Sequence, residues 1–235
     1  MNSESVDLIA TDPPFNKGRD FHATPDSLAK GAKFQDRWSW ERDVHEEWVD
    51  QLTDDHPNLI DAINSARNAH SDGMGAYMCF MAVRLLEMHR VLKPTGSIYL
   101  HCDPTASHYL KAVMDAVFRS KQFRNEIIWF YKTGGTSNRW FARKHDNVFF
   151  YSKSQTHIFN VQKEKSYLSH KYGFSNIKLF EDERGTYRHV GVRDVWDIPA
   201  LRGNQPETAG FPTQKPLALY ERMIQASSDR GGGSS

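Results

Sequence analysis

The stretch VDLIATDPPFN, residues 6–16, sets the fold, because a short apolar run is followed at once by a rigid turn. Residues 6–11 are typical of a short buried β-strand. The strand ends at Asp12-Pro13-Pro14-Phe15, since two consecutive prolines cannot donate to a sheet ladder. Ligands of α/β sheets bind beside the carboxyl ends of the strands, so we expect the turn to place Asp12 in a ligand site.

The turn presents two hydrogen-bond acceptors in a fixed geometry, the Asp12 carboxylate and the backbone carbonyl of Pro13. Such a pair suits an exocyclic amine, which carries two N–H donors. The aromatic ring of Phe15 is close enough in the sequence to lie flat against the ring that bears the amine. The alternative interpretation is an ordinary turn in which Asp12 only caps a helix.

Outward from this turn, stretches with apolar residues at helical spacing alternate with short apolar runs. Residues 93–96 end a helix, and Asp103 followed by Pro104 is a typical start for the next one. The expected helices cover residues 77–91, 104–118 and 216–227, and the expected strands cover 96–101, 126–131 and 147–151, the last two joined through Gly134-Gly135. This order favours an α/β domain with a mostly parallel sheet.

Two long stretches interrupt this order. Residues 16–72 are polar and acidic, and we expect a long excursion with one or two short helices in which three tryptophans pack. Residues 152–211 are basic, aromatic and rich in turns. The final GGGSS, residues 231–235, resembles a flexible linker or an engineered tail.

Composition excludes several classes of protein. The chain has 235 residues and a formal net charge of +1, and no apolar run approaches the roughly 18 residues of a membrane-spanning helix. Residues 1–7 have neither the basic flank nor the apolar centre of a secretory signal. Cys79 and Cys102 are the only cysteines, which favours a reducing, cytoplasmic location.

The near-zero net charge conceals an asymmetry. Residues 26–72 hold 11 acidic and 5 basic side chains, whereas residues 119–193 hold 15 basic and 6 acidic ones together with 15 of the 29 aromatic residues. A basic segment interleaved with aromatic rings is what a polyanion with stackable bases favours. The alternative is a solvated face combined with ordinary core aromatics.

Several motifs in order resemble those of the amino-group DNA methyltransferases, which act on adenine N6 or cytosine N4. The matching segments are the catalytic motif at residues 5–16, the next helix and strand at 85–99, later strands at 125–132 and 145–154, and Thr213-Gln214-Lys215-Pro216-Leu217 before the first helix of the cofactor half. A catalytic motif that precedes the Thr-Gln-Lys-Pro segment is similar to the permuted β class. The resemblance covers residues 3–229 and implies a Rossmann-like methyltransferase sheet with helices on both faces.

The resemblance implies a role for each residue of the turn. Asp12 and the Pro13 carbonyl would accept hydrogen bonds from the target amine, Pro14 would stiffen the motif, and Phe15 would stack on the flipped base. An aspartate at position 12 favours adenine, because enzymes of the family that act on cytosine N4 more often carry serine there. The implied methyl donor is S-adenosylmethionine, bound by Asp12, Thr213, Gln214, Lys215 and Pro216.

The implied partner is double-stranded DNA, and the implied setting is restriction–modification. Residues 152–211 correspond to the variable region that selects the DNA sequence in the β class. The expected DNA contacts are Asn16 and the cluster Arg139, Trp140, Arg143 and Lys144, for which a solvated surface loop is the alternative.

The chain is expected to divide into a catalytic core (1–151), a recognition region (152–211), the start of the cofactor half (212–229) and a flexible tail (230–235). In the β class, a strand with a glycine-rich cofactor loop follows the Lys-Pro helix. This chain stops about where that loop should begin, so we expect an incomplete sheet with an exposed edge.

No metal site is expected. His101-Cys102-Asp103 has metal-binding side chains, but adjacent residues of a strand point to opposite faces and cannot converge. Two other functions stay open: a DNA-binding remnant without catalysis, and a methyltransferase for amines of RNA or protein. The sequence also leaves open whether the chain forms a homodimer.

Overall fold

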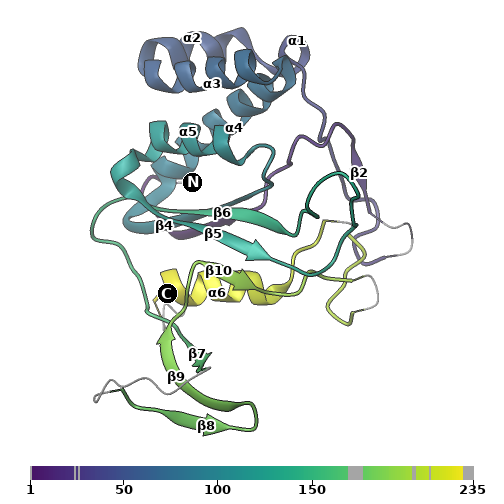
Figure 1. Ribbon diagram of the computed structural model, residues 1–235. Helices are drawn as coiled ribbons and strands as arrows, with labels where there is room; N and C mark the ends of the chain where they lie inside the picture. The colour runs from purple at the N-terminus through teal and green to yellow at the C-terminus, as the bar shows by residue number, and fades with distance from the viewer. Residues whose placement is uncertain are drawn as a thin grey trace.

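A five-stranded sheet forms the centre of the structure, a computed structural model that describes residues 2–23, 25, 27–168, 177–202, 205–211 and 213–229. Figure 1 shows this sheet between a layer of helices above and helix α6 below. The strand order is β1-β4-β6-β5-β10. The strands are β1 (Val6–Thr11), β4 (Leu92–Cys102), β5 (Phe123–Phe130), β6 (His145–Ser152) and β10 (Val195–Asp197).

Within this described sheet, four of the five strands run in the same direction. β1 is parallel to β4 and β10 is parallel to β5, whereas β6 is antiparallel to both of its neighbours. The carboxyl ends of β1, β4 and β5 therefore meet at one edge, where β6 begins. The predicted α/β class with a mostly parallel sheet is confirmed, and β6 is the reversed strand.

Helices cover both faces of the sheet, as predicted. One face carries α3 (Pro57–Ala69), α4 (Asp72–Val91) and α5 (Ser107–Phe118), and the other carries α6 (Leu217–Ser227). Successive side chains of β4 point to opposite faces, so Ile98 and Leu100 enter the core under α3–α5 while Tyr99 packs with Leu219 and Met223 of α6. Within the described ranges, no helix combines the length and the apolar character needed to cross a membrane.

Two helices begin elsewhere than predicted. α4 begins at Asp72 rather than at residue 77, because the Ser71 hydroxyl caps it by accepting an N–H of its first turn. α5 begins at Ser107 rather than at residue 104, because Asp103 first closes a turn by accepting the Ala106 N–H at 3.1 Å. Both differences lie at helix starts, which local capping contacts decide.

A close approach between β1 and β4 requires a glycine at position 96. A Cβ atom there would lie 2.9 Å from the Leu92 side chain and 3.0 Å from the carbonyl oxygen of Asp7. The pairing register of the two strands shifts beside it, between Val6 and Leu8. The segment predicted to end the helix therefore also begins the strand.

The prediction of one or two short helices within residues 16–72 was wrong. This stretch contains α1 (Trp40–Asp43), α2 (Glu46–Asp55) and α3, and a short hairpin of β2 (Phe21–His22) and β3 (Lys33–Phe34). Buried residues of α3 recur at helical spacing within an otherwise polar sequence: Leu59, Ile60, Ile63 and Ala66. The predicted packing of the tryptophans is confirmed for Trp38, whose ring centroid lies 4.2 Å from that of Phe80.

Residues 152–211 contain two different arrangements. β7 (Lys163–Tyr167), β9 (Gly185–Gly191) and β8 (Phe180–Asp182) form an antiparallel sheet that projects below the body in Figure 1. β10 then returns to the main sheet, where Trp196 packs in the core beside Trp129. The predicted tail, residues 230–235, lies outside the described residues.

Candidate active site

The Asp12 turn lines a pocket of about 800 Å³ at the carboxyl edge of the sheet. β1 delivers Asp12 to this edge, and residues 13–15 continue along the pocket wall. The opposite walls come from the β2–β3 hairpin, through Phe21 and Phe34, and from the segment that leads into α6. The fold thus brings together residues that are distant in the sequence. Asp12 and Lys215, for example, are 203 positions apart.

The Asp12 carboxylate has a partner on each oxygen. Oδ1 lies 2.7 Å from His101 Nδ1, and Oδ2 accepts a hydrogen bond of 2.8 Å from Lys215 Nζ. Burial alone raises the pKa of Asp12, but the hydrogen bonds and charges of His101 and Lys215 outweigh it and hold the pKa below its ordinary value. Asp12 is therefore an ionised acceptor at neutral pH.

His101 joins Asp12 to a second carboxylate. Its side chain is only 3% exposed, and its Nε2 lies 3.2 Å from Asp146 Oδ2. The Tyr131 hydroxyl donates to the other oxygen of Asp146 at 3.3 Å. Burial lowers the pKa of His101, but the hydrogen bonds that its ring makes to the two carboxylates reverse that effect, and the pKa lies above its ordinary value.

The sequence did not predict His101 as a site residue, because the stretch His101-Cys102-Asp103 was interpreted only with respect to a metal site, which its strand geometry excludes. The signal available was its place at the carboxyl end of the strand beside β1, where Leu100 pairs with Thr11. Among the residues that the structure describes, no three His, Cys, Asp or Glu side chains are grouped as metal ligands.

The Phe15 ring lies close to the imidazole of His101 and to two ammonium groups. Its centroid is 5.0 Å from that of His101 in an edge-on arrangement, 5.1 Å from Lys215 Nζ and 5.8 Å from Lys17 Nζ. Lys17 also forms an ion pair with Asp103. The ring therefore stands at the pocket wall with cations beside it.

A buried aspartate fixes the end of the turn. Asn16 has a left-handed backbone (φ +58°), and its N–H donates to Asp36 Oδ1 at 2.5 Å. The Lys17 N–H donates to Asp36 Oδ2 at 2.9 Å. Asp36 is 1% exposed, and burial raises its pKa despite these two bonds. Asp36 was also missed, because no local pattern links it to residues twenty positions away.

Of the predicted cofactor residues, the structure brings Asp12, Thr213, Gln214 and Lys215 around one pocket, whereas Pro216 is the N-cap residue of α6. The Gln214 amide braces its own loop. Its Oε1 accepts the Ala209 N–H at 2.6 Å, and its Nε2 donates to a carbonyl oxygen at 2.7 Å. Lys215 Nζ likewise donates to the Thr213 carbonyl at 3.0 Å.

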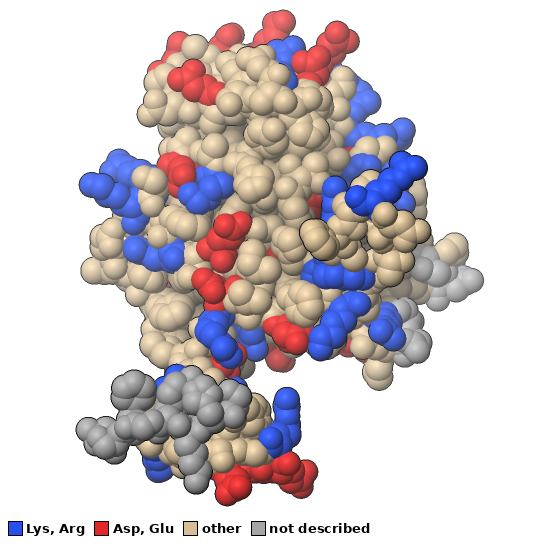
Figure 2. Space-filling view, viewed as in Figure 1, with Lys and Arg blue, Asp and Glu red and all other residues tan. Residues whose placement is uncertain are grey.

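The predicted basic cluster lies on the loop between β5 and β6, at the same edge as Asp12. Arg139 and Arg143 are exposed, as are Trp140 (62%) and Phe141 (98%). Lys144 differs, because its Nζ donates to three carbonyl oxygens of its own loop at 2.7–3.3 Å. In Figure 2, Lys and Arg side chains gather on the right of the body, where Figure 1 places the loops of this edge.

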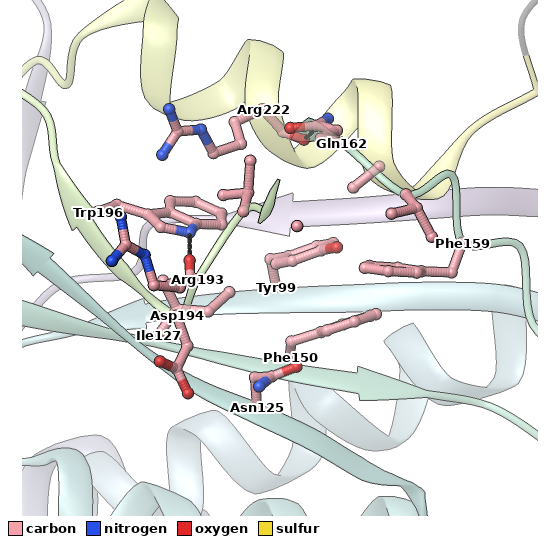
Figure 3. Close-up of a pocket in the computed structure, with 14 residues that line it drawn as sticks. Tyr99, Asn125, Ile127, Phe150, Phe159, Gln162, Arg193, Asp194, Trp196 and Arg222 are labelled. Atoms are coloured by element: carbon pink, nitrogen blue, oxygen red, sulfur yellow. Dashed lines mark hydrogen bonds between the residues drawn. The ribbon is translucent and has the colours of Figure 1, made fainter. Parts of the chain in front are cut away.

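A second, smaller pocket of about 260 Å³ lies between the sheet and α6 and shares no lining residue with the first. Figure 3 shows the stacked rings of Tyr99, Phe150 and Phe159 along it, with Trp196 at its other end. The sequence did not predict this pocket, because its walls come from six separated segments of the chain.

Comparisons with a family model and with known proteins all identify relatives among the DNA methyltransferases. A family model described as DNA methylase, for N6 and N4 methyltransferases, matches residues 6–233. The type II methyltransferase M.HpaI of Haemophilus parainfluenzae is 25% identical over 98% of this chain and 56% of its own length. The DNA adenine methyltransferase YhdJ of Escherichia coli is 27% identical over 97% of this chain and 63% of its own length.

This chain therefore spans 56–63% of the length of these two relatives. Among solved structures, the cytosine-N4-specific PvuII DNA methyltransferase matches 97% of this chain and 65% of its own chain, with a TM-score of 0.47 and 15% identity.

Proposed function

This chain belongs to the DNA methylase family of N6/N4 methyltransferases, and we propose that it transfers a methyl group from S-adenosylmethionine to the N6 amine of adenine in DNA. The observation that carries the proposal is the Asp12-Pro13-Pro14-Phe15 turn, which lines a pocket at the carboxyl edge of the sheet. Inside this pocket Asp12 is an ionised acceptor held by two basic side chains.

The turn supplies what the amine needs. The Asp12 carboxylate and the Pro13 carbonyl accept the two N–H bonds of the target, so that the nitrogen lone pair is directed away from the turn. Because Asp12 stays ionised, its carboxylate stabilises the positive charge that develops on the nitrogen. The chain thus acts by positioning and by electrostatics.

The residues around the pocket fit S-adenosylmethionine. The volume of about 800 Å³ lies within the usual range of small-ligand sites, roughly 300–1,000 Å³. Aromatic rings and the carboxylates of Asp12 and Asp36 suit a ligand that combines a flat base with a sulfonium cation. When bound, the cofactor supplies the methyl group as an electrophile. The residues that would hold it are Asp12, Thr213, Gln214 and Lys215, which line the pocket.

Adenine as the target is supported by the aspartate at position 12 and by a relative described as a DNA adenine methyltransferase. The N6 amine is paired inside the duplex, so the base has to be extruded to reach Asp12. Phe15 then stacks on the base. The ammonium groups of Lys17 and Lys215 that now lie near this ring would give way to it.

We propose that duplex DNA lies along the carboxyl edge. Support comes from the exposed loop that carries Arg139, Trp140 and Arg143, and from Asn16 at the end of the turn. Lys144 contributes by holding this loop in shape. The projecting sheet within residues 152–211 is proposed to read the DNA sequence.

The test is Asp12→Ala, assayed in parallel for methyl transfer from labelled cofactor and for binding to duplex DNA. We expect transfer to fall by about 10²- to 10³-fold, the range for the loss of one group that stabilises developing charge. DNA affinity should stay nearly unchanged. Asp197→Ala, at the carboxyl end of β10, is the matched control and should keep full activity.

Full activity of Asp12→Ala would contradict the proposal. DNA binding by the unmodified chain without any transfer would instead support a non-catalytic DNA-binding remnant. Transfer to RNA or to a peptide in preference to duplex DNA would support a different amine methyltransferase.

A further inference from the structure

We propose that His101 is a positioning residue for Asp12, and that Asp146 holds His101 from behind. The proposal rests on the proposed function, because it assigns a task to the residue behind the acceptor of the target amine. Asp12, His101 and Asp146 form a row of hydrogen-bonded side chains, and this row fixes the orientation of the Asp12 carboxylate when a substrate enters the pocket.

The geometry of the row leaves the imidazole little freedom. Each ring nitrogen of His101 faces a carboxylate oxygen, at 2.7 Å toward Asp12 and at 3.2 Å toward Asp146. Two aromatic rings fix the plane of the imidazole: Phe15 stands edge-on at 5.0 Å, and Trp129 at 5.4 Å between ring centroids. Because two carboxylates and two aromatic rings restrain the His101 imidazole, the imidazole can in turn restrain the Asp12 carboxylate.

His101 does not itself reach the substrate. It is buried and does not line the 800 Å³ pocket, whereas Asp12 and Lys215 do. Lys215 holds Asp12 Oδ2 from the pocket side, where an incoming amine must bind. His101 holds Oδ1 from inside the protein. Lys215 can therefore yield to the substrate while His101 keeps the carboxylate in place.

The number of N–H groups that the His101 ring must provide decides whether it is neutral or charged. A neutral imidazole has one N–H and can donate to only one carboxylate, so its other nitrogen would face an oxygen lone pair. The two carboxylates, one facing each ring nitrogen, therefore favour the imidazolium, which donates to both. The groups around it are Asp12 after β1, Asp146 on β6 with Tyr131 behind it, and Lys215 before α6. Lys215 is the one cation of this set, and it opposes protonation.

The experiment compares three variants of the full chain in steady-state methyl transfer to duplex DNA. His101→Leu removes both contacts, and we expect kcat to fall about 10²-fold with KM for DNA nearly unchanged, as for a misplaced reacting group. His101→Asn keeps a donor toward Asp12 and should recover at least part of this loss. His89→Asn, on a half-buried histidine of α4, is the matched control and should behave as the parent chain.

The pH profile distinguishes positioning from a merely structural role. In the parent chain kcat should decline as pH rises and His101 loses its second proton. Asp146→Asn removes one of the two carboxylates that favour the imidazolium, so this decline should move to lower pH. An unshifted profile in Asp146→Asn, or full kcat in His101→Leu, would overturn the proposal.

A second measurement needs no turnover. Carbon-13 NMR of the Asp12 carboxyl group reports its titration in the parent chain and in His101→Asn and His101→Leu, with circular dichroism as the check of folding. We expect the pKa of Asp12 to rise in His101→Leu, because burial is then opposed by Lys215 alone. An unchanged Asp12 titration in a folded variant would overturn the proposal even if the parent chain transfers no methyl group, which is the separate failure of the proposed function.

Discussion

Asp12, which is partly buried, and Asp36, which is buried, are two carboxylates at one pocket whose pKa values shift in opposite directions. Burial raises the pKa of both, but Asp12 has His101 and Lys215 as hydrogen-bonded basic partners, and its pKa falls below the ordinary value. Asp36 has two backbone N–H groups instead, and its pKa stays above the ordinary value. The difference suits their positions, since Asp12 must be charged for its proposed task and Asp36 only holds the turn.

Replacing Asp36 tests the second of these roles. Asp36→Ala leaves the N–H groups of Asn16 and Lys17 without their acceptor, which should cost about 1–3 kcal/mol of unfolding free energy. Thermal unfolding followed by circular dichroism should show a Tm lower by about 2–4 °C for each kcal/mol lost. Asp61→Ala, an exposed aspartate of α3, is the control and should leave Tm nearly unchanged.

The effect of Asp36 should also depend on pH in a defined direction. Its folded pKa is raised above the unfolded value, so its protonated form favours the folded state at low pH, and that contribution is lost as pH rises through the folded pKa. The Tm difference between the parent chain and Asp36→Ala should therefore be larger in mildly acid solution than at neutral pH. The opposite trend would contradict this account of Asp36.

The site residues that the sequence predicted most directly are those whose partners are neighbours in the sequence. Asp12 and Pro13 stand side by side, and the proline pair marks the strand end without help from other segments. His101 and Asp36 could not be found in this way. Asp12 and His101 are 89 positions apart, and Asn16 and Asp36 are 20 apart, so their contacts exist only once the sheet and the excursion are folded.

At the scale of elements, α3 and α4 cross at a point where only a glycine fits. A Cβ atom on Gly75 would lie 2.6 Å from the Cβ of Arg67 and 3.2 Å from its Cα. Glycine within a helix normally lowers stability by about 0.5–1 kcal/mol relative to alanine. Glycine at position 75 is therefore explained by the close packing of α3 against α4 and not by helix propensity.

Gly75→Ala should therefore destabilise the fold, although the substitution favours a helix in isolation. We expect a loss of about 1–3 kcal/mol, the usual cost of overpacking a core, measured by urea unfolding. Gly135→Ala is the control, because a Cβ atom there meets nothing within 4 Å. A gain in stability for Gly75→Ala would show that α3 moves aside without cost.

Elements were predicted wherever their pattern was strongly apolar. β1 was predicted at its observed bounds. For the stretch that contains α2 and α3, only one or two short helices were predicted, because the exposed faces of these helices make the whole stretch polar. The reversed direction of β6 could not be read from its residues, since an apolar run looks the same in either direction. Pairing with β4 and β5 decides it.

At the scale of the whole molecule, charge is unevenly distributed. Several acidic side chains lie along the upper rim of the helical layer in Figure 2, and the basic loop between β5 and β6 lies at the edge that carries Asp12. This arrangement favours the approach of a polyanion at the carboxyl edge over its approach at α1–α3. The charge counts along the sequence predicted the asymmetry, and the topology adds that the basic loop and the Asp12 turn share an edge.

DNA binding should accordingly depend on salt, with a defined contribution from the exposed arginines. Arg139→Ala and Arg143→Ala should each weaken binding to any duplex sequence and reduce the slope of log K against log salt by about 1. Fluorescence anisotropy at several salt concentrations measures this slope. Arg90→Ala, on the far end of α4, is the control. A slope unchanged in both loop variants would mean that DNA does not lie along this edge.

Mass spectrometry of the nucleosides from duplex DNA incubated with this chain and S-adenosylmethionine tests the proposed methyl transfer most directly. We expect N6-methyladenine in the product of the parent chain and about 10²- to 10³-fold less with Asp12→Ala. N4-methylcytosine instead would keep the Asp12 mechanism but overturn the choice of base. Equal amounts of either product with and without Asp12 would contradict the account.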